Sequence, residues 1–316
     1  MKTIPIAVSV VLMVCVCQVA LGATFYVAPP PSGHDSNPGT EGEPFATIQK
    51  GIDAASDRDT VIVAEGTYIE NIRFKRKTPK NIVLRSTDPL DPDVVANTII
   101  DDNQAGSVVT FSSVEDETCV LSGFTIRNGE AETGGGIWGG TVDSHTHATI
   151  RNNVITGNRC IAPSIYESGG GLHRCDGLIE NNTISQNYSE EVGGGLAFCH
   201  GTIRGNTISA NSAPNSSGGG LRTCNGTIES NVISGNSAIA GGGLFDCAGT
   251  IQNNVISGNS CERSGGGLSG CNGMIQNNVI ADNHSGEGPY GGGGLRRCSG
   301  PIRNCIIWGN TAPSDA

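Results

Sequence analysis

Residues 218–236 read Gly-Gly-Gly-Leu-Arg-Thr-Cys-Asn-Gly-Thr-Ile-Glu-Ser-Asn-Val-Ile-Ser-Gly-Asn, and close copies of this motif recur through the second half of the chain. The leucines that follow the glycines are 23 to 27 residues apart, at Leu172, Leu196, Leu221, Leu244, Leu268 and Leu295. A cysteine comes three positions after each leucine, followed by two isoleucine positions and a closing asparagine. Self-similarity at a fixed period of about 20 to 50 residues is the sequence signature of stacked repeats.

Each copy contains short β-branched runs bounded by glycine, asparagine and serine, a pattern typical of strands separated by turns. No segment between the copies has the length or periodicity of a helix. A unit of this size cannot bury its apolar face alone, whereas stacked coils bury a continuous core. The sequence therefore predicts an all-β fold, a right-handed parallel β-helix whose coils occupy residues 60–311.

Equivalent residues on successive coils should lie about 4.8 Å apart, the spacing of neighbouring strands. The closing asparagines are then expected to form a hydrogen-bonded ladder. The cysteines should stack as buried thiols rather than form disulfides, because parallel side chains point the same way. An outward row should run beside the first isoleucine series, with partly alternating charge, through Arg151, Glu180, Arg204, Glu229, Gln252, Gln276 and Arg303.

The chain begins with features of an export signal. Lys2 is followed by an apolar run over residues 6–16, and small residues around Ala23 suit a signal peptidase. The apolar run is shorter than the ~20 residues of a membrane span. We therefore expect a signal peptide over residues 1–22, a secreted or cell-surface location, and a protein that is not integral to the membrane.

The segment before the repeats, residues 23–59, is expected to hold an N-terminal strand and a capping helix. Phe45, Ile48, Ile52 and Ala55 fall on one face of a helix predicted over residues 44–55. Early strands are predicted at residues 60–64 and 81–84. Only a short tail, residues 312–316, follows the last coil, so the sequence suggests either a truncated chain or docking of that end onto another surface.

Several stretches resemble secreted pectin-lyase-like β-helix repeat proteins. Phe25-Tyr26-Val27, residues 33–40 and residues 44–49 are similar to the opening of such proteins, and residues 61–68 are similar to the strand and turn that follow. The resemblance covers residues 24–311. It implies a superfamily rich in polysaccharide lyases, glycosidases and epimerases, alongside adhesins. The Gly-Gly-Gly-Leu repeats also resemble those of bacterial outer-surface proteins.

Several catalytic signatures of that superfamily are missing from the sequence. There is no lysine after Lys80 to act as a base, and neither a Gly-His-Gly segment nor an Asp-Pro-His motif occurs. No catalytic residue can be assigned, and enzyme status stays open between a polysaccharide lyase or glycoside hydrolase and a protein without catalysis.

Two groups of residues are candidates for binding. Alternation along a strand would place Asp143, His145 and His147 on one face, with ligand types suited to a divalent metal such as zinc or calcium. A sugar-binding groove is predicted from cationic and aromatic residues that follow the glycine-rich segments, namely His173, Arg174, Arg222, Phe245, Arg296 and Arg297.

The net charge of −11 disfavours nucleic acid as a partner, because nucleic-acid binding relies on clustered cations. The expected partner is an extracellular polysaccharide or a cell surface. We expect a secreted protein that binds or processes polysaccharide. The alternative is an adhesin or a structural solenoid without catalysis, and function is expected most where the repeat is broken, between Gly129 and Ser168.

Overall fold

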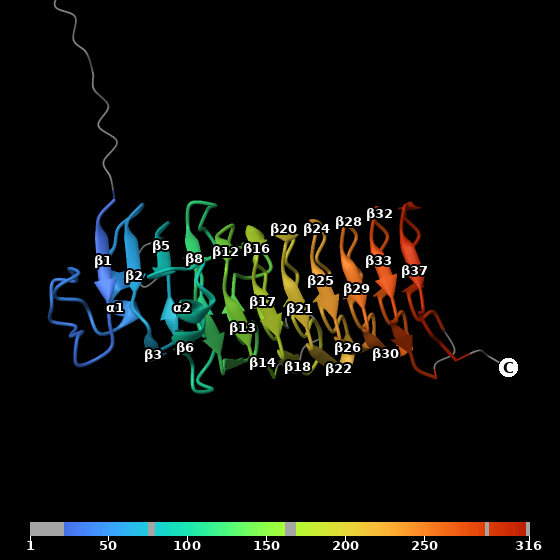
Figure 1. The fold of residues 1–316 in the computed structure, drawn as a ribbon, viewed down its shortest axis with the longest axis horizontal. Coiled ribbons are helices and arrows are strands. Elements are labelled where there is room, and N and C mark those ends of the chain that lie inside the picture. Colours follow the sequence, from blue (N-terminus) through green and yellow to red (C-terminus); the bar gives the residue numbers. More distant parts are fainter. Residues whose placement is uncertain (1–21, 75–79, 162–168, 288–290, 314–316) are drawn as a thin grey trace, which may run out of the picture.

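The protein is described by a computed structural model that covers residues 22–74, 80–161, 169–287 and 291–313. The predicted signal peptide, apart from Gly22, lies outside the described residues, as do residues 314–316 of the predicted tail. The described part is an elongated solenoid, with its first coils at one end and its last coils at the other (Figure 1). This architecture confirms the prediction of an all-β parallel solenoid.

Four parallel sheets, named A to D here, run along the solenoid. Sheet A contains β1 (Thr24–Val27), β2 (Thr60–Val63), β5 (Val83–Ser86), β8 (Val120–Ser122), β12 (Thr149–Arg151), β16 (Leu178–Glu180), β20 (Thr202–Arg204), β24 (Thr227–Glu229), β28 (Thr250–Gln252), β32 (Ile275–Gln276) and β36 (Ile302–Arg303). Sheet B contains β3 (Gly66–Ile69), β6 (Thr98–Asp101), β9 (Thr125–Arg127), β13 (Val154–Thr156), β17 (Thr183–Ser185), β21 (Thr207–Ser209), β25 (Val232–Ser234), β29 (Val255–Ser257), β33 (Val279–Ala281) and β37 (Ile306–Trp308).

The other two sheets are built from shorter strands. Sheet C contains β4 (Ile72–Arg73), β7 (Val109–Thr110), β11 (Ile137–Trp138), β15 (Leu172–His173), β19 (Leu196–Ala197), β23 (Leu221–Arg222), β27 (Leu244–Phe245), β31 (Leu268–Ser269) and β35 (Leu295–Arg296). Sheet D contains β10 (Glu130–Ala131), β14 (Arg159–Cys160), β18 (Tyr188–Ser189), β22 (Ser212–Ser217), β26 (Ser237–Ala240), β30 (Ser260–Ser264) and β34 (His284–Ser285). A regular coil visits the sheets in the order A, B, D, C, as β24 to β27 do.

The core is a set of stacked apolar side chains, one column for each sheet position. Ile228 of sheet A, Ile233 of sheet B and Leu244 of sheet C are all fully buried, and each pairs in register with the same residue type on the next coil. Because burial of apolar area is the main favourable term in folding, these columns supply the driving force for stacking coils.

Two asparagine ladders occupy the corners on either side of sheet B. The predicted ladder is confirmed: Asn187 Nδ2 donates to Asn211 Oδ1 at 3.0 Å, and Asn211 Nδ2 repeats this contact with Asn236. A second ladder, which the sequence analysis did not predict, connects Asn182, Asn206 and Asn231 in the same way. In both ladders the amide also donates to a backbone carbonyl of the preceding coil, so buried polar groups are satisfied.

The ten described cysteines are free thiols, as the stacking argument predicted. Five members of the repeat column are fully buried, and Cys199 Sγ is typical in donating to the backbone carbonyl of Ala197 two residues earlier, at 3.5 Å. Burial raises the pKa of the Cys224 thiol well above its usual value. This column therefore behaves as small core side chains.

The repeated glycines occupy a turn where backbone from neighbouring coils comes very close. A Cβ atom on Gly219 would lie 2.5 Å from the carbonyl oxygens of Ser237 and Gly242. Gly218 has φ of +75°, a left-handed conformation that side chains rarely adopt. The triple glycine is thus required by the geometry of the turn between sheets D and C.

Two helices interrupt the strands. α1 (Ile48–Ala54) lies where a helix was predicted, with Ile48 and Ile52 buried and Thr47 as its N-cap, and it contacts strands of the first coils. Its role as a cap stays a prediction. α2 (Pro92–Asn97) was not predicted. It belongs to an insert between β5 and β6 and lies against β6 and β9 of sheet B (Figure 1).

Candidate functional site

The outward residues of sheet C form one continuous row. They occupy the second position of successive strands and pair in register, and we call them the sheet C stripe: Trp138, His173, Ala197, Arg222, Phe245, Ser269 and Arg296. Four of the six residues predicted to bind sugar, His173, Arg222, Phe245 and Arg296, lie in this stripe. Arg174 and Arg297 follow directly, with left-handed backbone at φ of 54° and 48°.

The stripe lies in the angle between sheet C and the glycine-rich turn that leads into it. An added Cβ on Gly218 would lie 2.7 Å from Cβ of Arg222, and one on Gly241 would lie 2.8 Å from Cβ of Phe245. The absence of side chains on this turn therefore leaves room for the long side chains of the stripe. This explains why Arg222, Phe245 and Arg296 are partly buried although they face away from the core. Of the other predicted residues, His173 and Arg174 are buried and Arg297 is exposed.

Arginine and phenylalanine form stacked pairs along this surface. The Arg222 guanidinium lies 5.2 Å from the ring centroid of Phe245, and Arg174 lies at the same distance from Phe198. Arg222 Nη1 donates to Ser217 Oγ at 2.6 Å, whereas its buried Nε has no hydrogen-bond partner among the described residues. Desolvation lowers the pKa of Arg222, an effect that nearby Asp246 opposes. The Arg222 guanidinium therefore retains an N–H group without a hydrogen-bond partner among the described residues, and it is partly shielded from water.

A polar cluster lies beside the first coils of the stripe. His145 Nδ1 is 2.7 Å from Asp176 Oδ2, and His145 Nε2 is 3.0 Å from Arg174 Nη1. Because arginine only donates hydrogen bonds, Nε2 must accept and Nδ1 must carry the proton. Both ring nitrogens of His145 are engaged, so in this arrangement it is not available as a general base.

The structure does not bring the predicted metal ligands together. Gly140 and His145 form an antiparallel bridge around a turn, so the expected strand through Asp143, His145 and His147 is wrong. Asp143 and His147 are exposed, whereas His145 is engaged by Asp176 and Arg174. Within the described ranges, no three His, Cys, Asp or Glu residues are grouped in a way that could hold a metal ion.

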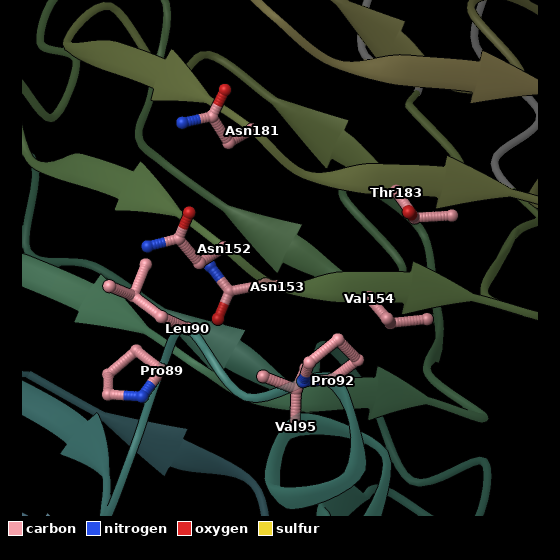
Figure 2. A pocket seen from close by; sticks show the side chains of 9 residues that line it. All are labelled: Pro89, Leu90, Pro92, Val95, Asn152, Asn153, Val154, Asn181 and Thr183. Carbon is pink, nitrogen blue, oxygen red and sulfur yellow. The ribbon is translucent and has the colours of Figure 1, made fainter.

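A second hollow, missed by the sequence analysis, lies beside the α2 insert. Two adjoining clefts of about 240 and 330 Å³ share Pro89, Leu90 and Asn152 in their walls. Figure 2 shows the first of them, with the insert on one side and the polar residues of the next coils on the other. The pair Asp91-Pro92, an N-cap followed by proline at the first helical position, was the sequence signal for this insert.

Comparison with known sequences gives two matches. Residues 31–82 match a family described as "Protein of unknown function (DUF1565)". A stretch of 156 residues is 29% identical to "Uncharacterized protein YwoF" of Bacillus subtilis (strain 168), covering 48% of this chain and 27% of that protein. The match thus spans about a quarter of the relative's length.

Among solved structures, pectate lyase Pel9A is similar, with a TM-score of 0.55 over 94% of this chain and 78% of that chain at 13% identity. The complex structure of XylC with xylose gives a TM-score of 0.40 over 84% of this chain and 67% of that chain, also at 13% identity. The likeness to Pel9A supports a right-handed parallel β-helix. At this identity it concerns the fold alone.

Proposed function

We propose that this protein is a secreted β-helix protein that binds an acidic extracellular polysaccharide along the sheet C stripe. The observation that carries the proposal is the alignment of Arg222, Phe245 and Arg296 on one outward row, with Arg222 stacked on Phe245. Pectate lyase Pel9A, which shares the fold, is by its name an enzyme acting on an acidic polysaccharide, and this is consistent with the proposed ligand class.

The chemistry of the stripe suits carboxylate-bearing sugars. A guanidinium binds a carboxylate through two parallel hydrogen bonds, and partial burial strengthens that interaction because less water competes. The ring of Phe245 offers an apolar face for the C–H side of a sugar. Rungs about 4.8 Å apart can contact successive units of an extended polymer.

Export of the protein is part of the proposal. It is supported by the basic start and the apolar run of residues 6–16, and by the small residues around the proposed cleavage point near Ala23. In the part of the chain that the structure describes, no helix is both long and apolar enough to cross a membrane.

Binding, rather than catalysis, is the activity that the geometry supports best. His145 has the residue type of a general base, but Arg174 donates to its Nε2 lone pair. For His145 to act as a general base in polysaccharide cleavage, that contact would have to open. A structural solenoid or adhesin is the alternative, since stacking accounts for most residues of the regular coils.

The test is a binding assay with polygalacturonate, a polyuronate, and with dextran as a neutral polymer. We expect polygalacturonate to bind and dextran not to bind. The Arg222→Gln variant should bind polygalacturonate about tenfold more weakly, because a charged hydrogen bond contributes about 1.5–3 kcal/mol. Absorbance of unsaturated product in the same samples would reveal lyase activity.

The Arg303→Gln variant is the matched control, because Arg303 is an exposed arginine on sheet A, away from the stripe. It should bind polygalacturonate as the natural protein does. Equal affinity for dextran and polygalacturonate, or unchanged affinity in Arg222→Gln, would contradict the proposal. Failure to bind any polymer would favour the structural solenoid.

A further inference from the structure

The outward row of sheet A carries alternating charges over part of its length, and one position between two arginines lacks a carboxylate. Glu180 is in register between Arg151 and Arg204, and Arg204 Nε contacts its carboxylate at 2.6 Å. Further along, Gln252 Nε2 donates to Glu229 at 2.8 Å. In the same row Ser122 is in register between Arg85 and Arg151, so a short hydroxyl side chain stands where an acidic residue would complete the alternation.

Arg151 is the cation that this arrangement leaves unmatched. Glu180 makes its ion pair with Arg204, and no ion pair joins Arg151 to any residue in the described ranges. Arg85 is held in place because its Nη1 donates to the carbonyls of Ser86 and Thr87 at 2.9 and 2.8 Å. The larger cleft beside the α2 insert is lined by Arg85, Ser122 and Arg151 together.

The rest of this hollow suits a small hydroxylated ring. Leu90, with 79% of its surface exposed, and Pro89 form an apolar wall. Asn152 and Asn181, on neighbouring coils in Figure 2, present side-chain amides that make no hydrogen bond within the described part of the chain. An amide both donates and accepts, as recognition of sugar hydroxyls requires. The larger cleft, about 330 Å³, is at the lower end of the range for small-molecule sites.

We propose that the hollow formed by the two adjoining clefts binds an acidic monosaccharide, with its carboxylate over Ser122 between Arg85 and Arg151 and its ring against Leu90 and the two asparagines. Asp88 also lines the cleft, but its Oδ1 accepts from the backbone amide of Leu90 at 3.0 Å and so belongs to the turn of the insert. The site lies on sheets A and B, so it does not depend on polysaccharide binding along sheet C.

Isothermal titration calorimetry of the full chain with D-glucuronate, D-glucose and acetate tests the proposal. Glucuronate should bind at least tenfold more tightly than glucose, because only glucuronate can fill the position between the arginines. It should also bind more tightly than acetate, because acetate lacks the ring. Equal affinities for glucuronate and glucose, or for glucuronate and acetate, would overturn the proposal.

Two variants locate the site. Arg151→Gln changes an exposed side chain and should weaken glucuronate binding about tenfold or more. Ser122→Glu should abolish binding by supplying the missing carboxylate from the protein itself. Arg303→Gln, at the far end of the same outward row, is the control and should bind glucuronate normally. Unchanged affinity in Arg151→Gln would refute the assignment even if Ser122→Glu failed to fold.

Discussion

Replacement of Asn211 by alanine is expected to lower the free energy of unfolding by about 3–5 kcal/mol. Asn211 is fully buried, and its Nδ2 donates to Ile184 O at 2.9 Å and to Asn236 Oδ1 at 3.0 Å. Its Oδ1 accepts from both the backbone amide and Nδ2 of Asn187 at 3.0 Å. Alanine would leave several buried groups without partners, each at a cost of about 1–3 kcal/mol.

Urea unfolding, followed by circular dichroism, measures this effect. Because repeat proteins can unfold in more than one step, both midpoint and slope should be compared. Asn253→Gly is a matched control: Asn253 is exposed, and its φ of 58° is one that glycine adopts readily. A loss in Asn211→Ala no greater than in the control would show that the ladder does not stabilise the coil.

The regular coils could be predicted because stacking acts on every copy in the same way. Ile228, Leu221 and Cys224 recur together every 23 to 27 residues, and a residue that recurs in a solenoid lies above its counterpart on the next coil. The second asparagine ladder follows from the same rule. Asn206 recurs as regularly as Asn211, so the period places its counterparts in a second column in the same way.

The features outside the repeat could not be predicted in this way. The pairing of His145 with Asp176, 31 residues later, depends on how one unique turn folds, and no period constrains that turn. The cleft beside α2 exists because an insert between β5 and β6 stands against coils that follow it in the sequence. The prediction that Asp143, His145 and His147 share one face assumed that they lie on a strand. The chain instead makes a turn there, so strand alternation does not apply to these residues.

The sugar-binding residues are an intermediate case. Arg222, Phe245 and Arg296 could be placed in one row from the repeat, because each follows the repeated leucine directly. The stacking of Arg222 on Phe245 and the hydrogen bond to Ser217 depend on side-chain conformation. Sequence periodicity therefore gives the position of a residue on the solenoid, whereas its partners depend on contacts across coils and corners.

Acidification is expected to destabilise the fold through His173. Its side chain is 1% exposed, both ring nitrogens are without partners among the described residues, and its ring lies edge-on to Phe198 at 5.8 Å. Desolvation, with smaller effects from Arg174 and His145, lowers the pKa of His173 from 6.5 to about 3. In the unfolded chain the same imidazole takes up a proton below pH 6.5, so the unfolded state binds more protons in this range.

The contribution of the unprotonated His173 to the free energy of unfolding is therefore fully present above pH 6.5. It is lost as the pH falls toward 3. Each pH unit in that window removes about 1.4 kcal/mol, so lowering the pH from 7 to 4 should remove about 3 kcal/mol. Urea unfolding at several pH values tests this. Carboxylates also titrate in the window, so the informative quantity is the difference between the natural protein and His173→Leu.

His173→Leu replaces a buried neutral ring with an apolar side chain and should flatten the pH dependence by about 3 kcal/mol between pH 7 and 4. His147→Gln, which changes an exposed histidine, should keep the dependence of the natural protein. If His173→Leu is as acid-sensitive as His147→Gln, the buried imidazole is not the source of the effect. A flattened profile would instead show that the sheet C stripe, where Arg222 and Phe245 also lie, holds an unprotonated histidine at neutral pH.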